Sequence, residues 1–207
     1  MRWHVLKSDY VFSCPWLKIR KDHVRQPSGH EIEDFYVVEQ PDWVNIVAIT
    51  PDERFIIEEQ YRHGISQVCY ELPAGMMEEG ENPLAAARRE LLEETGCESD
   101  DWQPFGMYVP NASGSTIHCY TFVARNVRQV AEPQFEESED IKLHRYTKQQ
   151  LITIMEQGLM PEAVMQAPIW KLINNIIYYY HHIAGQTIAH NCRSSFSASA
   201  YSCDQLS

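Results

Sequence analysis

The densest group of residues that could do chemistry lies in the stretch ELPAGMMEEGENPLAAARRELLEETG, from Glu71 to Gly96. If this segment is helical, Glu90, Glu93 and Glu94 lie within an arc of roughly 100°, at about 100° per residue. Carboxylates three or four residues apart on a helix repel one another, so this cluster weakens the helix that carries it. Two explanations remain open: a solvated acidic face, or ligands for a hard divalent cation such as Mg²⁺, which prefers carboxylate and phosphate oxygens.

Local signals predict the helix that must carry these carboxylates. Asn82 is a good N-cap residue, and Pro83 suits the first helical position, where its missing N–H costs nothing. Gly96 is typical of a left-handed C-cap, so we expect the helix to end near Thr95. The inward face is predicted to be formed by Leu84, Ala87, Leu91 and Thr95.

Strand-like patterns surround this helix. We expect one hairpin from 15–24 and 30–38 around the turn QPSG, and a second from 42–50 and 54–61 around PDE. Further strands are predicted at CYEL, 104–109, 117–125 and 141–146. A capping box at Thr147 and Gln150 predicts a helix ending near Gly158, and a last helix is expected over about 162–183. This order of elements indicates an α/β sandwich with a mixed sheet.

Composition limits the possible partners. The chain has 207 residues and a formal net charge of −12, which argues against binding to nucleic-acid phosphates. No apolar stretch is long enough to span a membrane, and the six cysteines form no C-x-x-C pair. We therefore expect a reduced, cytoplasmic protein that binds neither nucleic acid nor membranes. The Ser-rich segment 185–207 is predicted to be a flexible tail.

The spacing in the acidic stretch decides between its two explanations. It reads G-x5-E-x7-R-E-U-x-E-E-x-G-U, carried by Gly75, Glu81, Arg89, Glu90, Leu91, Glu93, Glu94, Gly96 and Cys97. This pattern resembles the Nudix box, the signature of hydrolases that act on nucleoside diphosphates linked to another moiety. The resemblance implies the Nudix α/β/α sandwich and a Mg²⁺ (or Mn²⁺) cofactor. It also implies metal ligation by Glu90 and Glu94, with Glu93 sharing or orienting the metal and the backbone carbonyl of Ala74 adding a ligand.

The resemblance extends to residues on both sides of the box. The segment EEQYRHGISQVCYELPAG is similar to the ADP-ribose and nucleoside-diphosphate-sugar pyrophosphatases. It implies substrate contacts for Arg62 and Glu71, although a surface ion pair would also explain Arg62. In the acidic loop FEESEDIKLHRY, Glu137 matches the position of the general base, and Glu139 that of a second acidic helper.

Aromatic residues of the N-terminal hairpin supply a candidate for stacking on the base of the substrate. Trp16 is that candidate, whereas most of the group formed by Phe12, Trp16, Phe35 and Tyr36 is expected to be core.

The expected function is Mg²⁺-dependent hydrolysis of nucleoside diphosphate sugars, small molecules of the ADP-ribose type, to a nucleoside monophosphate and a sugar phosphate. Relatives in this branch form homodimers in which the N-terminal hairpin crosses to the partner, so a homodimer is expected here. The resulting division is an N-terminal β-hairpin region (1–40), a Nudix domain (41–184) and the tail (185–207). Two alternatives stay open: another Nudix substrate, such as a nucleoside triphosphate, a dinucleoside polyphosphate or an RNA 5′ end, and a nucleotide-sugar sensor without turnover.

Overall fold

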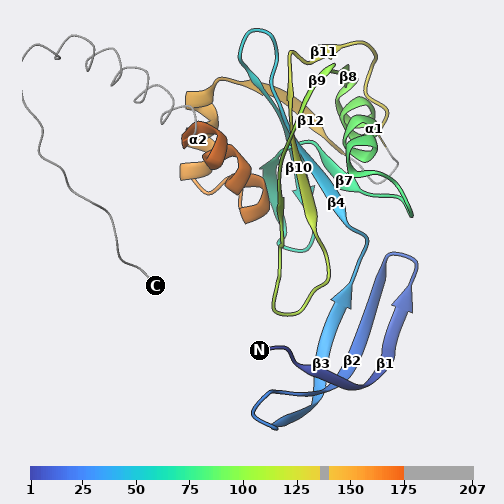
Figure 1. The fold of residues 1–207 in the computed structure, drawn as a ribbon. Helices are drawn as coiled ribbons and strands as arrows, with labels where there is room; N and C mark the ends of the chain where they lie inside the picture. The colour runs from blue at the N-terminus through green and yellow to red at the C-terminus, as the bar shows by residue number, and fades with distance from the viewer. Residues whose placement is uncertain (136–139, 175–207) are drawn as a thin grey trace, which may run out of the picture. The chain divides into compact units, whose positions relative to one another are not determined.

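A computed structural model describes residues 1–135 and 140–174 (Figure 1). Residues 1–169 form one compact unit, and of the second unit, which begins at Trp170, the described residues 170–174 are helical. The predicted tail (185–207) lies outside the described residues, as does the end of the last predicted helix. No helix in the described part of the chain is both long and apolar enough to cross a membrane.

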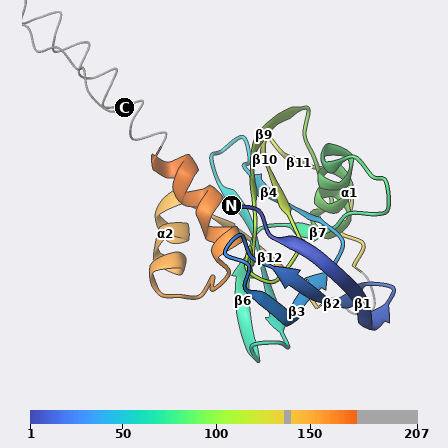
Figure 2. The same ribbon diagram turned by 60° about the horizontal axis from the view of Figure 1, so that its bottom comes forward.

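The central sheet has the strand order β7-β4-β10-β9. Its strands are β4 (Trp43–Ala48), β7 (Ala74–Met76), β9 (Asp101–Tyr108) and β10 (Cys119–Arg125). Strands β4 and β10 run parallel, while β7 and β9 are antiparallel to their neighbours, so the predicted mixed sheet is confirmed. Figures 1 and 2 both show α1 and α2 on opposite sides of these strands, as in an α/β/α sandwich.

Helix α1 (Pro83–Thr95) begins and ends where the sequence predicts. The Asn82 side chain accepts a hydrogen bond from the backbone N–H of Leu84, which caps the first turn. Gly96 closes the helix in the left-handed conformation, with φ of 66°. A Cβ at this position would overlap with the carbonyl oxygen of Ala131, so only glycine fits both the cap and the chain that passes it.

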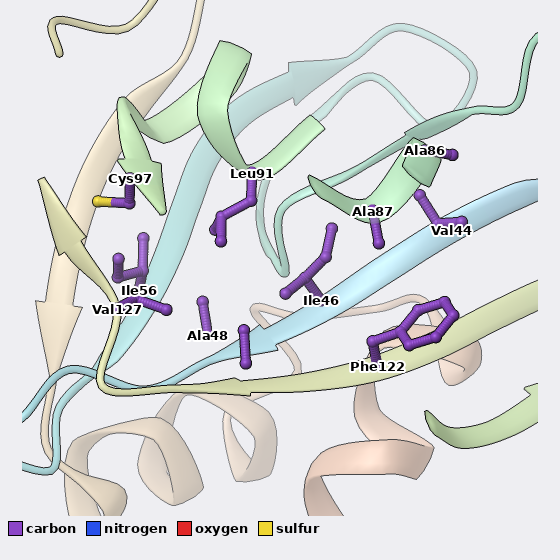
Figure 3. Close-up of a cluster of buried hydrophobic side chains, with 11 residues drawn as sticks. Val44, Ile46, Ala48, Ile56, Ala86, Ala87, Leu91, Cys97, Phe122 and Val127 are labelled. Atoms are coloured by element: carbon purple, nitrogen blue, oxygen red, sulfur yellow. The ribbon is translucent and has the colours of Figure 1, made fainter. Parts of the chain in front are cut away.

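The buried face of α1 builds the main apolar cluster (Figure 3). Leu91 and the two alanines Ala86 and Ala87 are fully buried against the central sheet. Their partners are Val44, Ile46 and Ala48 of β4, Ile56 of β5, Phe122 of β10, and Cys97 and Val127. The small side chains of Ala86 and Ala87 allow α1 to lie close to β4. This close packing fixes the position of the helix on the sheet, and with it the position of its acidic residues.

A second sheet has the order β12-β5-β6 and is antiparallel throughout. Its strands are β5 (Phe55–Arg62), β6 (Gln67–Glu71) and β12 (Lys142–Tyr146). Helix α2 (Lys148–Glu156) follows with the predicted capping box between Thr147 and Gln150. Helical structure resumes over 163–174.

The predicted hairpin between β4 and β5 is wrong. Both strands exist, but β4 pairs with β7 and β10, whereas β5 pairs with β6 and β12. Only an isolated bridge between Ile49 and Phe55 joins them at the turn. The reason lies in burial, because β4 is buried on both faces over Val44–Ala48 and takes a neighbour on each edge from distant parts of the chain.

The N-terminal region is a three-stranded antiparallel sheet, one strand more than predicted. Strands β2 (Leu17–Arg25) and β3 (Glu31–Glu39) form the expected hairpin, and β1 (His4–Cys14) adds the third strand. Almost all side chains of β1 are exposed, and its sequence alternates poorly between apolar and polar residues. The sequence pattern therefore did not predict this strand. Two short strands, β8 (Cys97–Glu98) and β11 (Arg128–Gln129), complete the described elements.

Candidate active site

Two carboxylates of α1 are buried where the helix faces β7. Glu90 is 8% exposed and Glu94 is 4% exposed, although both are charged side chains at helical spacing. The Glu94 Oε2 atom accepts a hydrogen bond of 2.9 Å from the backbone N–H of Ala74. The Glu90 carboxylate occupies the space beside Gly75, where a Cβ would overlap with its carboxylate carbon and both oxygens. A glycine is therefore required for Glu90 to reach this position.

Arg89 joins Glu81, which precedes the helix, and Glu90 and Glu93 of α1 into one network. Its guanidinium donates to both oxygens of Glu81, at 3.1 and 2.9 Å, and to Glu90 Oε1 at 2.8 Å. It also contacts Glu93 Oε2 at 3.1 Å and the carbonyl of Met76 at 3.0 Å. These hydrogen bonds hold the pKa of Glu81 below its ordinary value and raise the pKa of Arg89. The single cation offsets part of the repulsion that the acidic spacing creates.

A cleft of about 760 Å³ opens over these residues. Its lining brings together α1, β7, the end of β5 and the turn between β1 and β2: Pro15, Trp16, Pro41, Trp43, Arg62, Ala74, Gly75, Met76, Met77, Glu78, Arg89, Glu90, Glu93, Glu94, Gln134, Phe135 and Glu162. Its volume falls in the range of small-molecule sites, with one strongly acidic wall and aromatic residues elsewhere. The acidic wall suits a cation, and the aromatic residues suit a planar ring.

Arg62 reaches this cleft from the end of β5, as its predicted role requires. Its Nε and Nη2 atoms hold the Glu71 carboxylate in a fork, with Nε 2.9 and 3.0 Å from the two oxygens. Glu71 is 2% exposed and also accepts from Gln60 Nε2 at 3.3 Å. Glu71 raises the pKa of Arg62 and leaves the Nη1 group without a partner among the described residues. Arg62 is thus fixed in position with donors to spare.

Trp16 also lies on the cleft, in the turn between β1 and β2, with its side chain 65% exposed. The expectation that most aromatics of this region are core is wrong, because Phe12 is 50% and Tyr36 52% exposed. Only Phe35 of the group is packed, edge-on against Trp3. The three-stranded sheet has no layer of its own to cover these rings.

Hydrogen bonds to α1 fix the chain that leads into the acidic loop. The carbonyl of Gly96 accepts from the N–H groups of Val130 and Ala131, and the carbonyl of Glu93 accepts from Gln134 at 2.7 Å. Gln134 and Phe135 consequently line the cleft. Glu137 and Glu139, the two residues assigned to proton transfer, lie outside the described residues.

The donor set on α1 and β7 fits a hard divalent cation. Glu90 and Glu94 present carboxylate oxygens beside the backbone of Ala74 and Gly75, in the cradle that a Cβ would fill. Glu93 stands at the edge of this set with a side chain 47% exposed and is held by Arg89. Within the described residues, no three His, Cys, Asp or Glu side chains already stand as a metal-binding cluster. Glu90 and Glu94 would therefore hold the ion together with waters and substrate oxygens, as is usual for Mg²⁺.

Comparison with known families agrees with this geometry. The NUDIX domain matches residues 39–161, more than half of the chain. The chain belongs to the Nudix family. Next to this Nudix domain, residues 3–38 match the nucleoside diphosphate sugar hydrolase N-terminal domain.

Several relatives of this Nudix protein are pyrophosphatases by name. The ADP-ribose pyrophosphatase of Mycobacterium tuberculosis is 35% identical over 140 residues, 66% of this chain and 66% of that protein. The methanol dehydrogenase activator of Bacillus methanolicus is 35% identical over 117 residues, 56% of this chain and 63% of that protein. The chain thus spans just under two thirds of the length of these two relatives. The ADP-sugar pyrophosphatase of Mus musculus is 29% identical over 188 residues, 79% of this chain and 85% of that protein.

Among solved structures, an ADP compounds hydrolase superposes with a TM-score of 0.72 at 18% identity, covering 89% of this chain and 97% of the other. This likeness shows that the two chains share the Nudix fold.

Some residues of the cleft were not predicted from the sequence. Glu162 lines the cleft from the start of the helical stretch 163–174, and Trp43 lines it from β4. Neither belongs to a spaced motif in the sequence. Only the tertiary fold brings them to the Nudix helix.

Proposed function

We propose that this Nudix protein hydrolyses the diphosphate bond of nucleoside diphosphate sugars of the ADP-ribose type, with Mg²⁺ or Mn²⁺ as cofactor. The products would be a nucleoside monophosphate and a sugar phosphate. One observation carries the proposal: Glu90 and Glu94 are buried around Gly75 in a cleft that Arg62 also enters. Burial of two carboxylates costs free energy, and a divalent cation with a diphosphate would offset that cost.

Different residues of the cleft would bind the metal, the phosphates and the base of the substrate. Glu90, Glu94 and the Ala74 carbonyl would hold the metal, and Glu93 would orient it. A divalent cation bound there would neutralise charge on the phosphoryl oxygens and acidify an attacking water. Arg62 would bind a phosphate through its Nη1 group, while Glu71 keeps the guanidinium in place. Trp16 would stack on the base, because its ring is exposed at the same cleft.

Proton transfer requires a residue that the metal does not occupy. We assign this role to Glu137, with Glu139 as the second candidate, since both follow directly in sequence after the cleft-lining Gln134 and Phe135. The hydrogen bond between Gln134 and Glu93 supports the assignment, because it begins the acidic loop beside the metal-binding helix. Glu137 would accept a proton from the water that attacks phosphorus.

A homodimer is part of the proposal. The N-terminal sheet leaves Val5, Tyr10, Val11 and Phe12 of β1 at least half exposed, and exposed apolar patches mark interaction sites on soluble proteins. A second copy of the chain would cover this surface. Replacement of Tyr10 and Phe12 by serine should convert a dimer into a monomer in light scattering, with Met107→Ser, at a 51% exposed site outside this sheet, as the control. A wild-type protein that is monomeric at micromolar concentration would contradict the proposed dimer.

The experiment for the main proposal is a turnover panel. Purified protein is incubated with ADP-ribose, ADP-glucose, GDP-mannose, diadenosine polyphosphates, nucleoside triphosphates and a capped RNA, each with and without Mg²⁺. We expect metal-dependent release of nucleoside monophosphate from the nucleotide sugars. A higher kcat/KM on triphosphates, dinucleotides or RNA would assign another Nudix substrate, and tight binding of a nucleotide sugar without turnover would indicate a sensor.

A further inference from the structure

Glu162 is a carboxylate of the cleft that the proposed reaction leaves without a task. Its backbone carbonyl accepts the first helical hydrogen bonds, from the N–H groups of Met165 and Gln166. The helical stretch is anchored to β4 because Asn45 Nδ2 donates to the carbonyl of Val164 at 2.9 Å. Glu162 is therefore held in place by its backbone, and its side chain lines the cleft.

The side chain of Glu162 has no structural role visible in its contacts. In the described part of the chain it accepts no hydrogen bond and forms no ion pair, not even with the N–H groups of its own helix. The nearby cation, Arg62, is already held in a fork by Glu71. An N-cap side chain that leaves its helix uncapped and points along a ligand cleft is available to a hydrogen-bond donor from outside the protein.

The charges around Glu162 indicate what kind of donor fits. Desolvation by the cleft walls and the negative charge of Glu71 raise the pKa of Glu162, and the positive charge of Arg62 opposes this shift. On the strand β10, the Cys119 thiol is fully buried, and desolvation together with Glu162 raises its pKa to about 12, so it remains neutral. A phosphate would be repelled by Glu162, whereas it would be attracted by Arg62 next to it. A neutral group with a hydrogen to donate suits Glu162.

We propose that Glu162 is a specificity-determining residue whose carboxylate accepts a hydrogen bond from a neutral donor of the substrate, a sugar hydroxyl or the amino group of the base, while Arg62 holds the adjoining phosphate. This inference rests on the proposed function. A site built around an acceptor discriminates strongly against analogues that lack the donor, because the acceptor is then desolvated without a partner. Glu162 thus selects among nucleotide sugars that the metal centre alone would treat alike.

The test compares three substrates with three proteins. The substrates are ADP-ribose, inosine diphosphate ribose, which lacks the amino group of the base, and ADP-2-deoxyribose, which lacks a hydroxyl of the terminal sugar. The proteins are wild type, Glu162→Ala and Glu156→Ala, an exposed carboxylate of α2 outside the cleft. We expect Glu162→Ala to lower kcat/KM for ADP-ribose by about 10- to 100-fold, mostly through KM, as for a lost hydrogen bond to a charged group. Glu156→Ala should behave as wild type.

The analogues identify the donor. If it is the base amine, Glu162→Ala should change kcat/KM for inosine diphosphate ribose less than threefold; if it is the sugar hydroxyl, the deoxy analogue should show this small effect. A kcat/KM for ADP-ribose that Glu162→Ala leaves unchanged, or a fall in kcat alone, would overturn the inference. Binding is also measured by calorimetry without metal, so that a wild-type protein that binds ADP-ribose but does not hydrolyse it contradicts the proposed function alone. A binding constant unchanged by Glu162→Ala contradicts the role of Glu162 alone.

Discussion

The Glu90 carboxylate lies in the space that a side chain at position 75 would occupy. This relationship couples β7 to α1, because the buried acid can approach the strand backbone only if residue 75 has no Cβ. The same approach places Glu94 within hydrogen-bonding distance of the neighbouring Ala74 N–H. The order of the motif, a glycine fifteen residues before the first glutamate of the pair, thus has a steric cause.

Gly75→Ala should displace the Glu90 carboxylate and leave the fold intact. We expect kcat/KM to fall by about 10²-fold, the scale on which a shift of roughly 1 Å in a catalytic group acts. Gly64→Ala is the matched control, since a Cβ there would meet nothing within 4 Å. The measurement is metal-dependent turnover together with circular dichroism. Full activity of Gly75→Ala would contradict the role of Glu90 in holding metal.

Glu94→Gln should abolish most metal-dependent activity, because it removes one ligand charge from the proposed centre. Loss of groups that merely orient ligands costs about 10- to 100-fold in metal affinity, so loss of a ligand should cost at least about 100-fold. Glu98→Gln, an exposed site on β8, serves as the control. Turnover is titrated against Mg²⁺ from micromolar to tens of millimolar. Near-normal rates at ordinary Mg²⁺ concentrations would exclude Glu94 as a ligand.

Glu137→Gln should lower kcat by roughly 10²- to 10⁴-fold, the usual scale for a lost general base, with little change in substrate affinity. The measurement is single-turnover hydrolysis at saturating substrate. If Glu137→Gln leaves kcat almost unchanged and Glu139→Gln lowers it strongly, the general base is Glu139. Two silent variants would show that neither residue is the base.

Arg62→Ala should lower both substrate affinity and stability. Glu71 would remain buried without its counter-charge, at a cost of about 1–3 kcal/mol in the free energy of unfolding. Adding Glu71→Gln should restore the free energy of unfolding but not the KM, because the substrate contact of Arg62 is still missing. Urea unfolding and steady-state kinetics measure the two effects. A double variant with wild-type KM would leave Arg62 only the role of an ion pair.

The raised pKa of Glu162 predicts a pH-dependent stability. Because the folded-state pKa exceeds the unfolded value of 4.5, the folded state holds the proton more tightly, and ionisation destabilises it as pH rises above about 4.5. Glu162→Gln should therefore raise the melting temperature at pH 7.5 and leave it unchanged at pH 4. Desolvation and the charge of Glu71 raise the pKa of Glu162, and the charge of Arg62 opposes this shift. The variants are compared by calorimetry, with Glu156→Gln as the control. A lower melting temperature at both pH values would indicate a structural role for Glu162.

Local signals predicted α1 fully, because its N-cap, first-turn proline and C-cap glycine are each decided within a few residues. The capping box of α2 was predicted for the same reason. Strand partners were not, since β4 and β5 follow one another around a tight turn yet belong to different sheets. The strand β1 lacks the alternation that burial of one face imposes, because the side chains on both of its faces are exposed.

For the candidate site, residues within the spaced motif could be named in advance. From the sequence, Arg62 and Glu71 were each predicted to contact the substrate. Their ion pair with one another was not predicted, because it depends on the register of β5 and β6. Glu162 could not be found, since it lies about 70 residues after the Nudix helix and reaches the cleft only through the anchoring of its helix on β4.

The hydrogen bonds that tie residues 130–134 to the end of α1 have a consequence for protein engineering. One end of the acidic loop is fastened to the Nudix helix at Gly96 and Glu93, and the other enters β12 beside the buried Ile141. These two attachments define a cassette between Phe135 and Ile141. Segments of other lengths, taken from Nudix proteins with different preferences, should be exchangeable there without loss of folding, whereas insertions before Gln134 should disrupt the helix cap as well. The segment proposed to supply the general base should thus be separable from the parts of the chain that stabilise the fold.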